Sequence, residues 1–555
     1  MPETQAPAAR GAGVPAPLTP GGGTRLYSSG TGSETGGGMA SGNEGRRRAW
    51  TRPARPAASA AVLALLLGAC AVGPDYLPPA DPPVGRYTRE PLKNPSAADR
   101  VATVQGGSAD QSFRSGADIP GQWWTLFRSK PLNRLVEEAL ANNPTLEAAQ
   151  ASLRIAQQNV EAQKGTLYPS VTATPQGLTA KAPGLDLQSP LNNNQLYYSL
   201  YTPQVGVSFN PDVFGGNRRQ IESLEATAEN QRFQLEAAYL TLTSNVVAAA
   251  IQEASLRAQI DATRRVIQAQ TDLLQLYNKQ LSLGQIAGAD VIQQQAALSL
   301  SMQLLPPLER QLAQQRNLLT ALAGRLPSEE VSQTFTLSAL HLPTRLPVSL
   351  PSRLVQQRPD VKAAEALVQQ ASANVGVAVA NRLPQFSITA TGGASAVKIA
   401  QLANPGAAFF TVIGSLTQPI FDAGTLFRRQ RAAEETLTQA QAQYRATVIG
   451  AFQNVADTLR ALQSDAKAVA AAEAAEKATG QSLALIRKQY AAGAVNSTQV
   501  LLAQQGYLSA LVTSASARAT QYADTAALFQ ALGGGWWNRA DVAPPPPETD
   551  PAKFL

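Results

Sequence analysis

The sequence has few of the side chains that enzymes most often use at their active sites. It contains one His, one Cys and three Met. One Cys cannot form a disulfide within the chain, and one Cys with one His cannot complete a typical metal site. The single His, His341, lies among Leu340, Leu342 and Pro343, with no acid or nucleophile beside it. We therefore expect no enzymatic activity, no metal site and no diffusible cofactor.

Charged residues are also scarce, at 15% of the chain against the roughly 25% of typical soluble proteins. The net charge of +7 belongs largely to the N-terminus, because residues 1–69 hold seven Arg and three Glu. The remainder has 39 basic and 36 acidic residues and no basic stripe with interleaved aromatics. Nucleic acid is therefore not an expected partner.

Proline is absent from two long spans, 212–305 and 420–543, although the chain has 38 prolines. Proline breaks helix interiors, so these spans permit very long helices. Residues 217–283 are rich in Ala, Gln, Leu and Glu, and as a helix they would be on the order of 100 Å long. A 3-4 spacing of mostly apolar residues from Leu256 to Leu281 predicts coiled-coil packing of this helix.

Two glycines, Gly284 and Gly493, are predicted to end the long helices, since glycine tolerates the left-handed conformation common at helix C-termini. A turn and a returning helix are expected after each glycine, at roughly 288–323 and 497–532. The sequence thus predicts two helical hairpins.

The second half of the chain repeats the first. Asn143-Pro144 and Arg358-Pro359 each open a helical segment, and the two prolines lie 215 residues apart. The two tip glycines lie 209 residues apart. A duplication of this length predicts one architectural unit built twice and placed around an axis.

Four segments alternate apolar with small polar residues, at 171–174, 205–209, 386–391 and 410–417. Apolar residues on one face of a strand and Ser/Thr on the other are typical of a membrane barrel around water. Loops are expected near 176–196 and 392–408. Four strands cannot close a barrel, and open edges in lipid leave backbone groups unsatisfied at several kcal/mol each. Several copies must therefore associate, and three copies would supply twelve strands.

The N-terminal region carries an export signal. Basic residues at 46–55 precede an apolar run at 57–67, and the sequence Leu67-Gly68-Ala69-Cys70 resembles a bacterial lipobox. The apolar run is shorter than the ~20 residues of a membrane span, which disfavours a transmembrane helix with an incidental Cys. The lipobox implies cleavage before Cys70, with S-diacylglycerol and an N-acyl chain on that residue. Ala71, where Asp would favour the inner membrane, favours the outer membrane. Residues 1–38 do not resemble a signal, so we expect translation to start at Met39.

Several motifs together resemble the outer-membrane efflux proteins, in particular the TolC-like lipoprotein branch of NodT type. Each motif is weak alone, but their order and spacing cover roughly residues 70–540. The motifs are residues 70–76, Trp123-Trp124-Thr125-Leu126-Phe127, Pro131-Leu132, Asn142-Asn143-Pro144-Thr145-Leu146, Pro419-Ile420-Phe421-Asp422-Ala423-Gly424 and Ala531-Leu532-Gly533-Gly534-Gly535-Trp536.

The resemblance implies an α+β membrane channel-tunnel: a homotrimer whose 12-stranded β-barrel in the outer membrane continues into a long periplasmic α-helical barrel. Such a channel is the exit duct of a tripartite pump for drugs or other small toxic compounds. Its partners are a periplasmic adaptor, an inner-membrane transporter of the resistance-nodulation-division type and outer-membrane lipid. Two alternatives stay open, a type I protein-secretion duct and a non-conducting periplasmic scaffold lipoprotein, and the lipid anchor favours efflux.

The expected organisation follows from the repeat and the resemblance. It comprises a leader and signal peptide (1–69), a lipid anchor with an extended segment (70–130), a first repeat (131–325), an equatorial linker (326–355), a second repeat (356–540) and a C-terminal tail (541–555) that is expected to be disordered.

The resemblance also implies a gate at the periplasmic helix tips. Asp290 and Tyr490 match positions that contact each other in the closed state of the family, although both are compatible with ordinary surface residues. The family often has an Arg where this chain has Val495, and acids where it has Gln499 and Leu502. We therefore expect a gate with fewer ionic restraints, which relies more on packing and on a hydrophobic constriction.

Two lysines, Lys279 and Lys488, lie near the predicted tips. They are candidates for contact with the adaptor. Solvated charges are the alternative interpretation.

Overall fold

A computed structural model describes residues 71–80, 82–90, 111–181 and 197–542. The predictions for Met39, the 1–69 leader, Cys70 and residues 543–555 lie outside this part of the chain. Within it, no helix combines the length and the apolar character needed to cross a bilayer.

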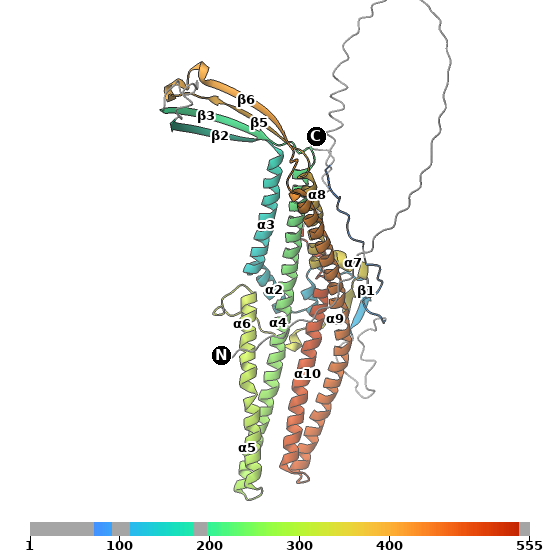
Figure 1. Cartoon of the computed structure of the whole chain (residues 1–555). Helices are drawn as coiled ribbons and strands as arrows, with labels where there is room; N and C mark the ends of the chain where they lie inside the picture. The colour runs from blue at the N-terminus through green and yellow to red at the C-terminus, as the bar shows by residue number, and fades with distance from the viewer. Residues whose placement is uncertain (1–70, 81, 91–110, 182–196, 543–555) are drawn as a thin grey trace, which may run out of the picture. The chain divides into compact units, whose positions relative to one another are not determined.

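Two helices of 67 residues each, α4 (Gly216–Ser282) and α9 (Thr425–Ala491), confirm the very long helices expected from the proline-free spans (Figure 1). Both begin with the same local device. The Asp212 carboxylate accepts a hydrogen bond from the Asn217 amide at 3.0 Å, and the Asp422 carboxylate accepts one from the Leu426 amide at 2.7 Å. A carboxylate in this place satisfies amides that have no partner within the helix, and it suits the positive end of the helix dipole.

The returning helices differ between the two halves. The second, α10 (Ser497–Ala531), is continuous, whereas the first is split into α5 (Gly288–Gln303) and α6 (Leu305–Leu322). The expectation of one unbroken helix at 288–323 is therefore wrong. Pro306 and Pro307 have no amide hydrogen to donate to the preceding turn, so the helical hydrogen bonds are interrupted and the helix breaks at Leu304. Figure 1 shows α5 and α6 beside α4, and α10 beside α9.

The long helix α4 buries most of its predicted seam. Tyr277 is 1% exposed, whereas Leu281, in the last turn of the helix, is 39% exposed. The other buried seam residues are Leu256, Ile260, Thr263 and Gln270.

The four predicted strands form one antiparallel sheet in the order β2-β3-β5-β6. Their bounds are β2 (Ser170–Lys181), β3 (Tyr197–Phe209), β5 (Gln385–Ala394) and β6 (Ala408–Thr417). The loop expected from residue 176 was placed too early, because β2 continues to Lys181.

The register of the sheet separates its two faces by polarity. On one face Val171 lies opposite Val207 and Phe386 lies opposite Leu416. On the other face Thr172 lies opposite Gly206, and Thr391 lies opposite Thr411. Residues paired across neighbouring strands share a face, so the alternation along each strand adds up to one apolar and one polar surface.

Each strand adjoins a helix in the sequence, and the helices keep the order of the strands. Helices α3 (Pro144–Lys164) and α8 (Pro359–Ala380) lead into β2 and β5, and each begins with the proline that marks its half of the duplication. Strands β3 and β6 lead into α4 and α9. Side by side, the helices run α3-α4-α8-α9, as the strands run β2-β3-β5-β6.

A mixed region packs around the middle of the long helices. A short parallel pair, β1 (Ser112–Ser115) with β4 (Arg345–Val348), lies there with α2 (Lys130–Asn142) and α7 (Pro351–Gln357). The fully buried Trp123 stacks on Phe529 of α10, with ring centroids 5.3 Å apart. Short 3-10 helices lie at Trp123–Phe127, Gly165–Leu167, Leu337–Ala339, Ile399–Gln401, Pro405–Ala407 and Trp536–Asn538.

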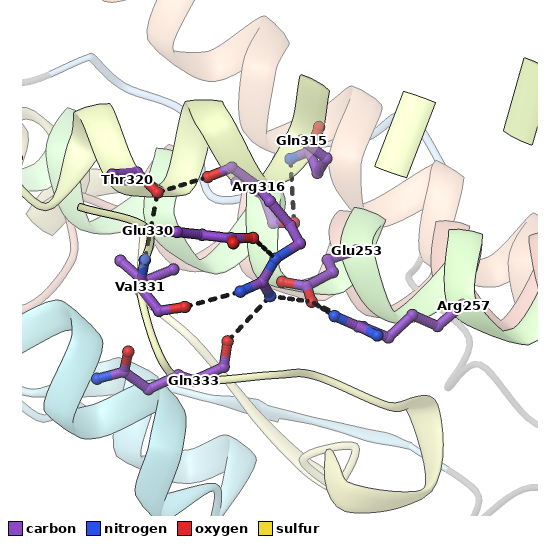
Figure 2. A network of polar contacts seen from close by, with 9 residues as sticks. Glu253, Arg257, Gln315, Arg316, Thr320, Glu330, Val331 and Gln333 are labelled. Atoms are coloured by element: carbon purple, nitrogen blue, oxygen red, sulfur yellow. Dashed lines mark hydrogen bonds and ion pairs between the residues drawn. The ribbon is translucent and has the colours of Figure 1, made fainter. Parts of the chain in front are cut away.

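A polar network centred on Arg316 ties α6 to α4 and to the segment that follows α6 (Figure 2). Arg316 Nη1 donates to the fully buried Glu253 at 2.9 Å, and Nη2 donates to the Val331 carbonyl at 2.7 Å. Arg316 also pairs with Glu330, and Arg257 holds Glu253 from α4 itself at 2.7 Å. Since a buried carboxylate is costly without cationic partners, the pairing of Arg316 with Glu253 holds α6 against α4.

Candidate functional site

The two hairpin tips share one backbone geometry. Gly284 has a φ of +70° and Gly493 a φ of +73°. Behind these glycines, the Gln285 amide donates to the Gln280 carbonyl and the Ala494 amide donates to the Gln489 carbonyl, each at 2.9 Å. A Cβ at either glycine would meet no atom within 4 Å. Glycine is therefore favoured here because it adopts the left-handed backbone of the helix cap, and not because a larger side chain would clash.

Three side-chain hydrogen bonds join the first hairpin to the second near the tips. Ser497 Oγ donates to Asp290 Oδ1 at 2.7 Å, which links α10 to the first turn of α5. Tyr490 Oη donates to Gln280 Oε1 at 3.2 Å, which links α9 to α4. Thr498 Oγ1 donates to Gln293 Oε1 at 3.5 Å, which is a second link between α10 and α5. The Ser497–Asp290 bond ends on a carboxylate, so it is the strongest of the three.

The predicted gate residues thus lie at this junction, but each bonds to a residue that the sequence did not single out. Asp290 accepts from Ser497, and Tyr490 donates to Gln280. A direct Asp290–Tyr490 contact in a closed assembly stays a prediction. Gln280 and Ser497 are polar residues of common types beside turns, and no sequence pattern sets them apart from their neighbours.

An aromatic contact lies directly behind these hydrogen bonds. The rings of Tyr277 and Tyr490 are 5.6 Å apart and tilted by 42°. Burial raises the pKa of the Tyr277 hydroxyl above its usual value, so this side chain stays neutral at physiological pH. The junction therefore combines an aromatic contact with three polar links.

Ionic links between the hairpins are absent at this level. Within residues 272–300 and 480–505, all of which the structure describes, no ion pair crosses from one hairpin to the other. Val495 is half-buried, and Leu502 is 61% exposed. At the tips the described chain thus relies on neutral or singly charged hydrogen bonds and on packing.

Lys279 and Lys488 are both exposed at the last turns of α4 and α9. Their carbonyls accept capping hydrogen bonds from Leu283 at 3.2 Å and from Ala492 at 3.1 Å. Contact of these lysines with an adaptor stays a prediction.

The segment that follows Cys70 packs against α4 and α8 at the ends of these helices that adjoin the β-sheet. Arg219, 5% exposed, bonds to the Val72 carbonyl at 3.2 Å and to Asp75 at 2.6 Å. Gly73 packs so tightly that a Cβ there would lie 2.4 Å from the Gly376 Cα. Apart from the motif at residues 70–76, no sequence pattern predicts this docking.

Comparison with known proteins shows the family of the chain and supports its fold. A family model for outer membrane efflux proteins matches residues 135–325 and 350–534. A probable efflux pump outer membrane protein, TtgC of Pseudomonas putida, is 26% identical over 486 residues, which cover 87% of this chain and 96% of TtgC. Outer membrane protein OprJ of Pseudomonas aeruginosa is 29% identical over 492 residues, with 86% and 95% covered.

Solved structures agree in fold. The outer-membrane channel OprN superimposes with a TM-score of 0.73 at 25% identity, and covers 84% of this chain and 100% of the OprN chain. The CmeC outer membrane channel of Campylobacter jejuni gives the same TM-score at 20% identity, with 84% and 95% covered. The family model spans well over half of the chain and both of its halves, and it describes channels and not enzymes. This chain belongs to the outer membrane efflux protein family.

Proposed function

We propose that three copies of this protein close into one channel, which conducts small toxic compounds passively out of the periplasm through the outer membrane. The observation that carries this proposal is the open sheet. Strand β2 forms one edge and β6 the other, and α3 and α9 form the matching edges among the helices.

Open edges cannot persist in lipid. An edge strand of ten residues, such as β6, turns about ten backbone N–H and C=O groups away from its sheet. Each costs several kcal/mol in hydrocarbon, so pairing with β2 of a second copy is strongly favoured. Because the edges are unlike, the contact is head-to-tail, and it ends when the ring closes. Three copies would give twelve strands.

The polarity of the sheet supports this orientation. The face with Val171, Val207, Phe386 and Leu416 suits lipid, and the face with Thr172, Thr391 and Thr411 suits a water-filled lumen.

Related channels suggest the cargo and the partners. One relative in Pseudomonas putida is named for toluene efflux and another for antibiotic efflux. We propose the same class of small toxic organic compounds here, delivered by an inner-membrane transporter of the resistance-nodulation-division type and a periplasmic adaptor. Lys279 and Lys488 are the proposed adaptor contacts, since both are exposed at the tips.

A lipid anchor is proposed at Cys70. The docked segment begins just after Cys70 and lies beside Phe214, near the end of α4 that adjoins the sheet. The Val72 amide donates to the Phe214 carbonyl at 3.2 Å. Several acyl chains placed there would enter the periplasmic leaflet, and more than one chain gives stable attachment.

The proposed gate is the tip junction, with the Ser497–Asp290 and Tyr490–Gln280 bonds within each copy and the predicted Asp290–Tyr490 contact in the closed channel. The family match at 135–325 and 350–534 supports the proposed repeats at 131–325 and 356–540.

The proposal is tested in cells from which this gene has been deleted. We expect greater sensitivity to toluene or to antibiotics, and recovery with the full-length gene. A Cys70→Ser variant separates the anchor from the channel, because it should lose acylation whatever its effect on transport. Unchanged tolerance to a broad panel of small toxic compounds after deletion, in a strain without a second such channel, would contradict the proposal.

A further inference from the structure

Three arginines converge on one phenylalanine at the sheet end of α9. The guanidinium carbons of Arg382, Arg428 and Arg431 lie 5.6, 6.0 and 5.5 Å from the centroid of the Phe427 ring. Distances of this kind are typical of cation–π contacts. We call these four residues the Phe427 cluster. All four side chains are exposed.

The positive charge of the cluster is poorly compensated. Arg431 pairs with Glu434 at 3.2 Å, whereas Arg382 bonds to the neutral Gln430. No ion pair of Arg428 is found among the described residues.

Cations at the sheet ends of two other helices, α3 and α4, are paired with acids. Arg218 pairs with Asp212 at 3.3 Å, and Lys164 pairs with Glu161 at 3.0 Å. The Phe427 cluster is therefore distinctive in its charge as well as in its geometry.

Strongly exposed apolar side chains lie beside the cluster in the turn between β6 and α9. Ile420 is 92% exposed and Phe421 is 89% exposed. The Arg382 carbonyl accepts a hydrogen bond from Gln418 Nε2 at 3.1 Å, which ties this turn to the start of β5. Apolar and cationic groups thus meet at one level of the chain.

In the proposed barrel the hydrocarbon ends near the start of α9, which brings the cluster to about the depth of the lipid headgroups. Helix α9 starts at Thr425, so Arg428 and Arg431 lie about 5 and 9 Å along its axis. The headgroup layer extends roughly 5–8 Å beyond the hydrocarbon on each side of a bilayer. Arginine guanidinium groups match phosphate in geometry and charge.

We propose that the Phe427 cluster binds the phosphate of a glycerophospholipid in the periplasmic leaflet, with the acyl chains against Ile420 and Phe421. The inference rests on the proposed barrel, which places the apolar face of the sheet in the membrane. A phospholipid fits because it joins an anion to apolar chains, as the surface joins cations to apolar side chains. The competing occupant is a second copy of the chain, since α9 is an edge helix.

The test measures binding of phosphatidylglycerol to the purified full-length protein by native mass spectrometry. The variant carries Arg382→Gln, Arg428→Gln and Arg431→Gln together. Three other exposed arginines, changed to Gln at Arg310, Arg445 and Arg487, serve as a matched control. At roughly fivefold per arginine, we expect the cluster variant to bind about a hundredfold more weakly and the control to bind as the unchanged protein does.

Further arms make the outcome decisive. Phe427→Leu keeps an apolar side chain but removes the ring, and it should weaken binding to an intermediate degree. Glycerol phosphate, which has no acyl chains, should not replace the lipid. Equal lipid binding by the cluster variant and the control overturns the inference.

Dissociation of the cluster variant into single chains also overturns the inference, because it assigns the arginines to contact between copies. If the unchanged protein is a single non-conducting chain, the proposed function fails instead.

Discussion

The hydrogen bond between Ser497 and Asp290 gives the sharpest prediction about gating. Ser497→Ala removes this 2.7 Å bond, which joins the two hairpins at the tips. A hydrogen bond to a charged group contributes about 1.5–3 kcal/mol when buried. Both residues are half-buried, so we expect about 1 kcal/mol per chain. If the three copies open together, about 3 kcal/mol per channel shifts the ratio of open to closed channels roughly 100-fold.

Single-channel recording in planar bilayers measures this shift as open probability. Ser299→Ala is the matched control, because Ser299 lies on α5 and its hydroxyl donates to the Gln295 carbonyl of the same helix at 3.0 Å. Asp290→Ala should raise the open probability about as much as Ser497→Ala, and the double variant should add little. If Ser497→Ala behaves like Ser299→Ala, the Ser497–Asp290 bond does not hold the channel closed. Unchanged closed-state conductance in Asp290→Ala would remove Asp290 from the gate.

Three further predictions concern stability. Arg316→Gln leaves the buried Glu253 with one arginine instead of two, which should cost about 2–3 kcal/mol and speed hydrogen exchange of residues 326–335 about 30-fold or more. Burial, together with neighbouring Asp524, raises the pKa of Asp465 from 3.8 to about 7, so the folded protein holds a proton that the unfolded chain releases. Stability should therefore fall as pH rises from about 4 to about 7, and Asp465→Asn should abolish that fall in thermal unfolding. Gly73→Ala places a Cβ 2.4 Å from the Gly376 Cα of α8. The clash should detach residues 71–76 from the helices and make them more susceptible to proteolysis.

Control variants at Arg264, Asp457 and Gly85 test the effects at Arg316, Asp465 and Gly73. Arg264→Gln, in an exposed pair with Glu309, should cost at most about 1 kcal/mol. Equal exchange in Arg264→Gln and Arg316→Gln would refute the role of the Arg316 network. Asp457→Asn, on the exposed side of α9, should leave the pH dependence unchanged. A Gly73→Ala protein as resistant to protease as Gly85→Ala, at a site with open space around it, would exclude tight docking.

The regular elements could be predicted because each depends on short-range chemistry. The absence of proline between 212 and 305 permits α4, and alternation along 386–391 specifies β5. The conformational freedom of glycine marks the helix ends at Gly284 and Gly493. In each case a period or a residue type acts within a few neighbours along the chain, so the sequence itself carries the signal.

The rest depends on contacts between distant segments. Ser497 meets Asp290 across 207 residues, and nothing in either neighbourhood marks the pair. The paired strands β1 and β4 have four residues each, too few for a period to show. The break at Leu304 could have been found, because Pro306 and Pro307 stand in the sequence, but the apolar pattern around them continues and masks it.

One chain supplies four strands, too few to close a barrel, so several copies must share one. The most direct test of this shared barrel is the mass of the full-length protein extracted from native membranes, measured in lipid on the same sample that is recorded for conductance. We expect three copies per particle and a conducting pore. A stable particle of one chain that conducts no ions would contradict the account.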